Sequence, residues 1–123
     1  MYAKILIVEN NDDFREIVKN HLKTKNPDFE IFEAVSAESA IKEALDKRPR
    51  IILMDMRLPN VSGMETAKVI KENFAECFIV ILTMLDTGEF QKFYGNGFIS
   101  AFVNKSEIYD KLFPLLQKFL IRI

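Results

Sequence analysis

The sequence contains one cysteine and no tryptophan, and glycine and proline are scarce, at four residues each. A single thiol, Cys77, cannot form an intrachain disulfide, and this cysteine usage is typical of a reducing compartment, so we expect a cytoplasmic protein. So little glycine and proline, beside 49% apolar residues, excludes collagen-like, low-complexity and disordered chains. We therefore expect a folded protein in which Cys77 is a buried core thiol.

Long hydrophobic runs and an excess of one charge are also missing. No apolar run approaches the roughly 18 residues that cross a bilayer, and residues 1–4 lead straight into a strand-like run rather than a signal peptide. The net charge of −1 gives no reason to expect nucleic-acid binding. At this length we predict one domain over residues 1–123, with no membrane segment.

Short apolar runs alternate with longer amphipathic stretches, which is the pattern of a parallel sheet covered by helices on both faces. Four of the runs lack polar alternation, as buried strands do: residues 5–8, 51–54, 78–82 and 101–103. A fifth run, residues 29–35, mixes in charges, as an edge strand does. The chain is therefore predicted to be an α/β protein, a flavodoxin-like doubly wound (βα)₅ three-layer sandwich with a parallel five-stranded sheet in the order 2-1-3-4-5.

Capping residues indicate where the helices between these strands begin. Asn11 or Asp12 caps the first helix, Ser36 the second, and Ser62 with Glu65 forms a capping box for the third.

Two later helices are predicted from other signals. The fourth spans Thr87 to Tyr94, with glycines closing it. The last is expected to start at Asp110 rather than at Ser106, because Pro114 then falls at the end of the first turn. Pro114 is also expected to disfavour helical geometry at Phe113.

Polar residues follow the predicted strands at the points where they end. Residues 9–13 follow the first strand, Asp55 ends the third, Thr83 ends the fourth, and Asn104 and Lys105 end the fifth. Because the carboxyl ends of parallel strands share one edge of the sheet, we expect one polar site there, near the point where the strand order reverses.

This combination of residues suits phosphoryl transfer to a carboxylate. Carboxylate and amide oxygens are ligands suited to Mg²⁺, which beside Asp55 would neutralise charge on an incoming phosphoryl group. Lys105 and Thr83 could contact the remaining phosphoryl oxygens, and aspartate is a side chain that forms covalent phosphoryl intermediates. Neither a P-loop nor a G-x-G-x-x-G motif follows the first strand, which argues against a nucleotide site there.

Four segments in order, residues 4–16, 51–65, 80–83 and 102–105, resemble the receiver domain of bacterial two-component response regulators. Within them, Pro59 follows Asp55 by four residues and Gly63 follows it by eight, which are the family's spacings. The resemblance implies that a histidine kinase or phosphotransfer protein phosphorylates Asp55, with Mg²⁺ as cofactor. The metal ligands that it implies are the side chains of Glu9, Asn10 and Asp55 and the backbone carbonyl of Arg57.

The resemblance also implies a switch. Thr83 would close on the phosphoryl group, Lys105 would pair with it, and Phe102 would change rotamer. The face made by the fourth helix, fifth strand and fifth helix would then bind partners or a second copy in a homodimer. Such a domain is not an enzyme beyond Mg²⁺-dependent self-phosphorylation and autodephosphorylation. It would bind neither nucleic acid nor membrane, and no output domain is present in residues 1–123.

One position departs from the family. Asn10 stands where the acidic pair normally has its second aspartate, which removes one negative charge and predicts weaker Mg²⁺ binding. Asp12 or Asp13 either supplies the missing carboxylate or, as we favour, serves the start of the helix. The alternative function is therefore a degenerate receiver that binds proteins independently of phosphorylation. A third class, Mg²⁺-dependent aspartyl phosphatases, is disfavoured because Arg57 stands where the second aspartate of their Asp-x-Asp motif would be.

Overall fold

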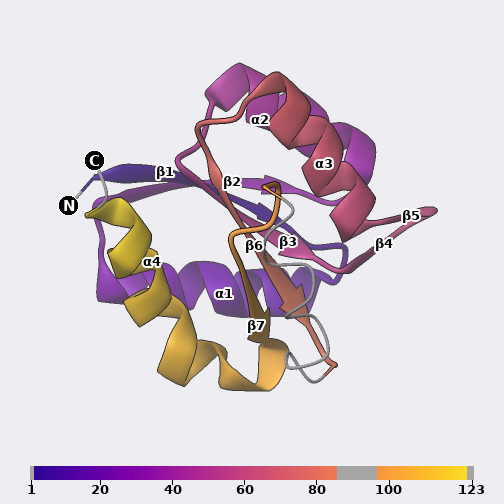
Figure 1. The fold of residues 1–123 in the computed structure, drawn as a ribbon. Coiled ribbons are helices and arrows are strands. Elements are labelled where there is room, and N and C mark those ends of the chain that lie inside the picture. Colours follow the sequence, from indigo (N-terminus) through magenta and orange to yellow (C-terminus); the bar gives the residue numbers. More distant parts are fainter. Residues whose placement is uncertain (1, 86–96, 122–123) are drawn as a thin grey trace.

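The protein alternates strands with helices along the chain, and the computed structural model describes residues 2–85 and 97–121 (Figure 1). The predicted fourth helix, Thr87 to Tyr94, lies outside the described residues. The elements in chain order are β1 (Ala3–Val8), α1 (Asp12–Lys25), β2 (Phe29–Ala34), α2 (Ala37–Lys47), β3 (Ile51–Asp55), β4 (Arg57–Leu58), β5 (Val61–Ser62), α3 (Gly63–Asn73), β6 (Phe78–Thr83), β7 (Ala101–Asn104) and α4 (Phe113–Leu120).

The five longer strands form one parallel sheet in the order β2-β1-β3-β6-β7. This is the predicted order 2-1-3-4-5, because the short strands β4 and β5 form a separate hairpin and take two numbers. The predicted fold class is confirmed. The register pairs Asp55 with Leu82 and Thr83 with Asn104, so the carboxyl ends of β3, β6 and β7 lie at the same edge.

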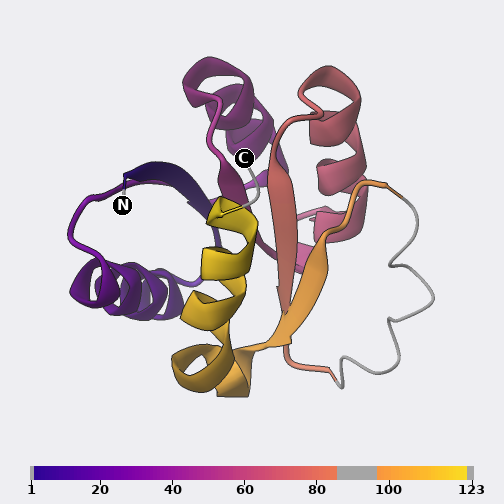
Figure 2. The same ribbon diagram turned by 60° about the vertical axis from the view of Figure 1, so that its left-hand side comes forward.

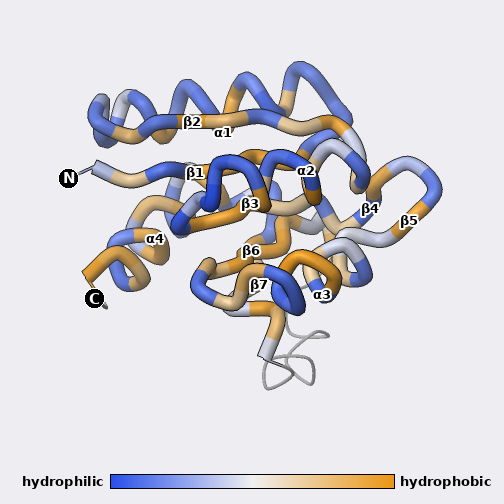
Figure 3. The backbone as a smooth tube through the Cα atoms, turned by 90° about the horizontal axis from the view of Figure 1, so that it is seen from above, coloured by the Kyte–Doolittle hydropathy of each residue, from blue (hydrophilic) through white to orange (hydrophobic). Residues whose placement is uncertain are grey.

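Helices cover both faces of the sheet (Figures 1 and 2). Small residues of α2 and α3, such as Ala40 and Ala67, pack with Met54 and Phe102 on one face, while Leu22 and other apolar residues of α1 and α4 pack on the other. Figure 3 shows β3 and β6 in hydrophobic colours and the outer turns of α1 in hydrophilic ones. None of the described helices is long and apolar enough to cross a membrane.

The single cysteine lies in this core, as predicted. Cys77 is buried, and burial raises the pKa of its thiol to about 11. The thiol is therefore protonated and unreactive at neutral pH.

The predicted capping residues begin the first three helices. Asn11, rather than Asp12, caps α1 and accepts a hydrogen bond from the Phe14 amide at 2.9 Å. Ser36 caps α2. Ser62 accepts a bond from the Glu65 amide at 3.1 Å, which is the first half of the predicted capping box. These bonds fix where each helix leaves the carboxyl edge of the sheet.

The last helix departs from the prediction. A 3₁₀ turn (Lys105–Glu107) and a π-helical turn (Ile108–Leu112) come first, and regular α-helix begins only at Phe113. Pro114 lies in the first turn of α4, where an amide donor is not needed. Phe113 has helical angles, φ −61° and ψ −43°, so the expectation that Pro114 would move it out of the helical region is wrong. The preceding turns are loosened instead.

The β4–β5 hairpin was not predicted. Arg57 pairs with Ser62 and Leu58 with Val61 in an antiparallel ladder, and Asn60 in the turn has a left-handed φ of +68°. The hairpin projects beside α3 (Figure 1). Strands of two residues are too short to show the alternating pattern by which strands are predicted.

Candidate functional site

The polar residues predicted at the strand ends gather at the carboxyl edge of the sheet. Glu9 follows β1, Asp55 ends β3, Thr83 ends β6, and Lys105 follows β7. The first three are buried, with 2%, 8% and 3% of their surface exposed. Buried polar side chains need partners, so their contacts indicate what this edge can do.

Lys105 bridges the two carboxylates. Its Nζ lies 2.8 Å from Glu9 Oε1 and 3.2 Å from Asp55 Oδ1. The same Nζ lies 4.7 Å from the ring centroid of Phe14, in the first turn of α1. The ammonium is therefore held from three sides, and three of the predicted site residues are in direct contact. Phe14 was missed, because no pattern in one sequence connects residues so far apart.

Asp55 keeps one oxygen available. Its Oδ1 accepts a hydrogen bond from the Arg57 amide at 3.2 Å and forms an ion pair with Lys105 Nζ, also at 3.2 Å. Its Oδ2 accepts none from the described residues, and 12% of the side chain remains exposed. The residue after Asp55 is also fixed in place, because the Gly63 amide donates a hydrogen bond to the Met56 carbonyl at 2.6 Å.

Glu9 is the most deeply buried charge of the site. Burial raises its pKa above the ordinary glutamate value, and the charge of Asp55 adds to this effect. The hydrogen bonds from Lys105 and from the Asn11 amide, the latter 3.0 Å from Oε2, act in the opposite direction. Further negative charge at this edge therefore requires a cation beside it.

Asn10 and the aspartates of α1 lie farther out. Asn10 is exposed, and its Nδ2 donates a hydrogen bond to the Val35 carbonyl at 3.4 Å. Asp12 pairs with Arg15 at 2.8 Å, and Asp13 is exposed in the first turn of the helix. Their positions agree with a role at the start of the helix. Within residues 2–85 and 97–121, no three His, Cys, Asp or Glu side chains form a group that could hold a metal.

The donor chemistry nevertheless suits Mg²⁺. Glu9 and Asp55 supply carboxylate oxygens, and Asn10 and the Arg57 backbone offer neutral oxygens nearby in the chain. Mg²⁺ commonly binds through one or two carboxylates, retains several waters and accepts ligands from a phosphate. Two carboxylates with neutral oxygens are sufficient for such a site, although they form a weaker one than three carboxylates would.

A pocket of about 340 Å³ opens beside Asp55. It is lined by residues 55–57 and 83–85 and by Lys105. Thr83 Oγ1 accepts a hydrogen bond from the Leu85 amide at 3.1 Å, and its hydroxyl donates to Met56 Sδ at 3.8 Å, a weak acceptor. The pocket therefore combines a nucleophilic carboxylate, a hydroxyl donor and an ammonium, the groups that bind a phosphoryl group.

Phe102 lies inside the core rather than at the surface. It is 6% exposed and packs with the cluster under α2 and α3, and the register places it beside Ile81. The Arg57 side chain is exposed, and its backbone amide is the part of the residue that bonds Asp55.

Comparison with known proteins agrees with this architecture. Residues 5–116 match the family model of the response regulator receiver domain. The chain is 33% identical over 90 residues to a protein-glutamate methylesterase/protein-glutamine glutaminase of Syntrophus aciditrophicus, covering 72% of this chain and 25% of that protein. It is 31% identical over 85 residues to the response regulator ArlR of Staphylococcus saprophyticus, covering 69% and 38%.

A solved structure extends the likeness over nearly the whole chain. A two-component response regulator of the LuxR family from Aurantimonas superposes with a TM-score of 0.88 at 25% identity, covering 98% of this chain and 86% of that one. The chain belongs to the response regulator receiver domain family. It is a receiver domain of the two-component type, and it spans about a quarter to two fifths of the curated relatives named above.

Proposed function

We propose that Asp55 is the phosphoryl acceptor of this receiver domain, with a histidine kinase or phosphotransfer protein as donor and Mg²⁺ as cofactor. The observation that carries the proposal is the arrangement around one pocket. Asp55 keeps an oxygen without a hydrogen bond from the described residues, Lys105 lies 3.2 Å from its other oxygen, and Thr83 lines the same pocket. A cytoplasmic location and a single receiver unit over residues 1–123 are part of the proposal.

The chemistry is a single displacement at phosphorus. A carboxylate oxygen of Asp55 attacks the phosphorus, and a new P–O bond forms as the bond to the donor's imidazole nitrogen breaks. The imidazole keeps that electron pair and takes up a proton from water. Lys105 stabilises the negative charge on the phosphoryl oxygens, and the Thr83 hydroxyl donates a hydrogen bond to one of them. The product is an acyl phosphate on Asp55, and its hydrolysis by water restores the carboxylate.

The Mg²⁺ ligands in this proposal are Glu9, Asn10, Asp55 and the backbone carbonyl of Arg57. When bound, the ion neutralises negative charge as the phosphoryl group approaches the carboxylates. Glu9 is held for this task by Lys105 and by the Asn11 amide. Beyond this self-phosphorylation and its reversal, we propose no enzymatic turnover.

Phosphorylation would change which groups Lys105 contacts. The phosphoryl group adds about −1.5 to −2 of charge, and the ammonium, now shared by Glu9 and Asp55, gains a stronger partner. Thr83 would move toward the phosphoryl group, and Phe102 would change rotamer at the neighbouring strand. The face that includes β7 and the C-terminal helix would then bind partners or a second copy. The domain itself would bind neither nucleic acid nor a membrane.

The test is intact-mass measurement after incubation with a small acyl phosphate and Mg²⁺. We expect the mass of one phosphoryl group to be added to the wild-type chain and none to Asp55→Asn. Asp46→Asn is the matched control, because Asp46 is an exposed aspartate of α2. Chelating Mg²⁺ should abolish the increment. An increment that persists in Asp55→Asn, or none in the wild type at any Mg²⁺ concentration, would overturn the proposal.

A further inference from the structure

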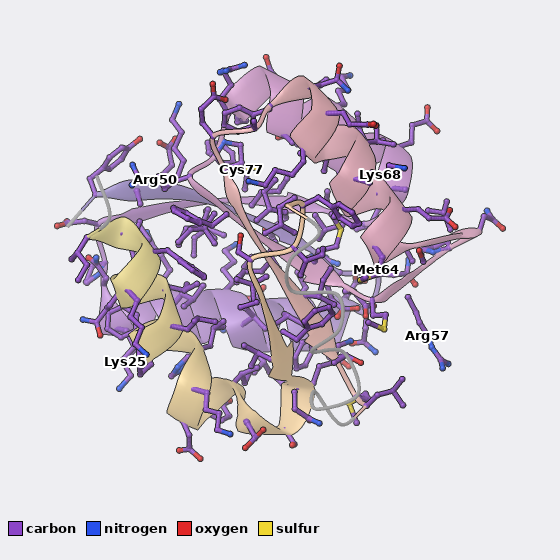
Figure 4. All side chains as sticks on the ribbon, in the orientation of Figure 1. Lys25, Arg50, Arg57, Met64, Lys68 and Cys77 are labelled. Atoms are coloured by element: carbon purple, nitrogen blue, oxygen red, sulfur yellow. The ribbon has the colours of Figure 1, made fainter. Side chains whose placement is uncertain are left out.

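A second pocket lies at the opposite, amino-terminal edge of the sheet. It has a volume of about 390 Å³. Tyr2 and Lys4 line it from the start of the chain, Arg48 and Arg50 from the segment before β3, and Phe74 and Glu76 from the segment after α3. Figure 4 labels Arg50 near one end of the sheet and Arg57 beside the hairpin at the other. None of the residues proposed for phosphorylation lines this pocket, and its volume is in the range of small-molecule sites.

The charge of the pocket is positive. Lys4, Arg48 and Arg50 face a single carboxylate, Glu76. That carboxylate is 73% exposed and lies 3.7 Å from Arg48, so the pair is long and open to water. Exposed pairs of this kind are weak and are easily exchanged for a better partner. A concentration of cations in a chain of net charge −1 indicates an anionic ligand.

The pocket also offers flat surfaces. The Arg48 guanidinium lies 4.4 Å from the ring centroid of Phe74, while 56% of the Arg48 side chain remains exposed. The guanidinium is thus stacked on one side and open to a second planar group on the other. Tyr2 adds a ring that is 63% exposed, and the buried side chains of Ala3 and Leu120 add apolar surface.

The backbone conformation at Arg48 is one that an arginine seldom adopts. Arg48 is the C-cap of α2 and has a left-handed φ of 49°. Glycine adopts this conformation most easily and is the commonest residue at such helix ends. An arginine in this conformation is strained relative to glycine. The contacts of its side chain with Phe74 and Glu76 are what arginine adds at this position.

We propose that this pocket binds a small organic anion that carries both a phosphate and a planar aromatic ring, the chemistry of a nucleoside monophosphate. Lys4 and Arg48 bind the phosphate, and the ring stacks on the open face of Arg48 or on Tyr2. Neither group alone uses the whole pocket, because a phosphate leaves the flat surfaces bare and a nucleoside brings no anion to Lys4 and Arg48. The proposal requires no step of the phosphorylation chemistry.

The experiment is an NMR titration of the ¹⁵N-labelled chain with AMP, adenosine and inorganic phosphate, without Mg²⁺. AMP should cause saturable shifts at residues 2–4, 48–50 and 74–77 and bind about tenfold more tightly than either fragment. Arg48→Gln and Lys4→Gln should each weaken AMP binding about tenfold, the usual range for a lost charge-assisted hydrogen bond. Lys42→Gln, which replaces an exposed lysine of α2, should change nothing.

Thermal unfolding of Arg48→Gln and Lys4→Gln is measured alongside, so that a loss of AMP binding is not mistaken for a loss of folding. Asp55→Asn should bind AMP as the wild type does, so failure of the phosphorylation proposal leaves this one intact. The absence of saturable AMP shifts at the pocket would overturn the proposal that the pocket binds a nucleoside monophosphate. So would AMP shifts that appear at the Asp55 edge and vanish in Asp55→Asn. Phosphate binding as tightly as AMP would show that the ring is not recognised and would equally refute the proposal.

Discussion

At the scale of single residues, the charge of the proposed phosphorylation site depends on three side chains. Glu9 and Asp55 carry two negative charges, and Lys105 contacts both. These three side chains therefore carry one more negative charge than positive charge. Burial also opposes ionisation of Glu9 by raising its pKa. A third carboxylate would increase this excess of negative charge and so the attraction for a divalent cation. Asn10 removes that third charge.

Restoring the charge tests this reasoning. Asn10→Asp should tighten Mg²⁺ binding about tenfold, a change of about 1.4 kcal/mol, because the ion gains a charged ligand beside Glu9. Titration followed by calorimetry or by NMR gives the affinity. Asn20→Asp, an exposed position on α1, is the matched control for a general charge effect. Equal affinity of Asn10→Asp and the wild type would show that residue 10 is not a ligand.

Gly63 controls the position of Asp55 through space rather than charge. A Cβ at Gly63 would overlap the backbone carbonyl oxygen of Asp55, which is rigid because it ends a core strand. Gly63→Ala should therefore displace the acceptor and slow phosphorylation at least about a hundredfold. It should also cost about 1 to 3 kcal/mol of stability, as overpacking does. Phosphorylation rates and urea unfolding measure the two effects.

Gly97→Ala is the control for Gly63→Ala. A Cβ there meets nothing within 4 Å, although φ is +83°. It should cost about 1 to 2 kcal/mol of backbone strain and leave the phosphorylation rate of the folded protein unchanged. A Gly63→Ala protein that is phosphorylated at the wild-type rate would contradict this account of Gly63.

His21 makes stability depend on pH. Its ring is half-buried on α1, 4.9 Å from the Tyr109 ring, and its Nε2 is buried without a hydrogen bond from the described residues. Burial, and to a lesser degree the charge of Lys25, lowers its pKa from the ordinary value. Folding therefore favours the neutral ring over the charged one.

The consequence has a definite sign. The stabilising contribution is fully present above the unfolded-state pKa of about 6.5 and is lost as pH falls through the lower folded-state pKa. Urea unfolding of the wild type at pH 7.5 and 5.5 should show this loss, and His21→Phe, which keeps a ring beside Tyr109, should reduce it. An equal pH dependence in both proteins would exclude His21 as the source.

At the scale of elements, two helices end with the same lysine contact. Lys23, near the end of α1, donates to the carbonyls of Pro27 at 3.1 Å and Phe29 at 2.9 Å. Lys71, near the end of α3, donates to the carbonyls of Ala75, at 2.9 Å, and of Cys77. Both lysines reach four and six residues ahead, into the turn that leads to the next strand. Each one satisfies loop carbonyls and places positive charge at the negative end of a helix.

These contacts predict a stability effect that surface lysines do not have. Lys71→Met should lower the free energy of unfolding by about 1 to 2 kcal/mol, because two carbonyls lose a charged donor. Lys23→Met should cost less, since Lys23 is more exposed. Lys42→Met, on the exposed face of α2, should stay within about 0.5 kcal/mol of the wild type. Urea unfolding measures all three, and equal stabilities would show that water replaces the lysine without loss.

The sequence predicted elements whose patterns are local. Five strands, their order and three helix starts follow from apolar runs and from capping residues such as Asn11, Ser36 and Ser62. The hairpin was missed because two-residue strands carry no periodicity. The start of α4 was misplaced because it was inferred from Pro114, which fits the first turn of a helix that begins at Phe113 as well as one that begins at Asp110. Where several backbone geometries satisfy one pattern, tertiary packing decides between them.

The same limit applies to the site. Strand ends brought Glu9, Asp55, Thr83 and Lys105 to one edge, as expected from a parallel sheet. The sequence could not show that one ammonium would bridge both carboxylates or that Phe14 would lie against it, because such contacts depend on rotamers. The roles of these residues in phosphorylation stay predictions.

At the scale of the whole molecule, the sheet connects the edge that holds Asp55 to the surface beside β7. β7 pairs with β6 next to Thr83, and it also contacts the π-helical turn Ile108–Leu112 that precedes α4. A groove of about 440 Å³ runs between β7 and that helix, lined in part by Phe102, Asp110, Leu115 and Lys118. Phe102 thus belongs to the strand that pairs with β6 beside Thr83 and also lines the groove, although its side chain packs under α2 and α3.

This groove carries charges suited to a symmetric dimer. Asp110, in the π-helical turn, and Lys118, in α4, are both exposed and line the groove. In a two-fold interface the same patch faces itself, so Asp110 of one copy can pair with Lys118 of the other, twice. We expect phosphorylation to favour this dimer, and light scattering after gel filtration should give a doubled mass for the phosphorylated chain and a single mass for Asp55→Asn.

Charge reversal tests the pairing itself. Asp110→Lys and Lys118→Asp should each weaken the phosphorylated dimer about tenfold or more, because each places like charges opposite one another at two symmetry-related points. The combined variant restores opposite charges and should recover most of the affinity, whereas reversal at Lys42 on α2 should have no effect. Recovery in the combined variant would not occur if the single changes acted only by disturbing the helix. A phosphorylated wild type that remains monomeric would contradict the predicted dimer, and a combined variant as weak as the single ones would place its interface elsewhere.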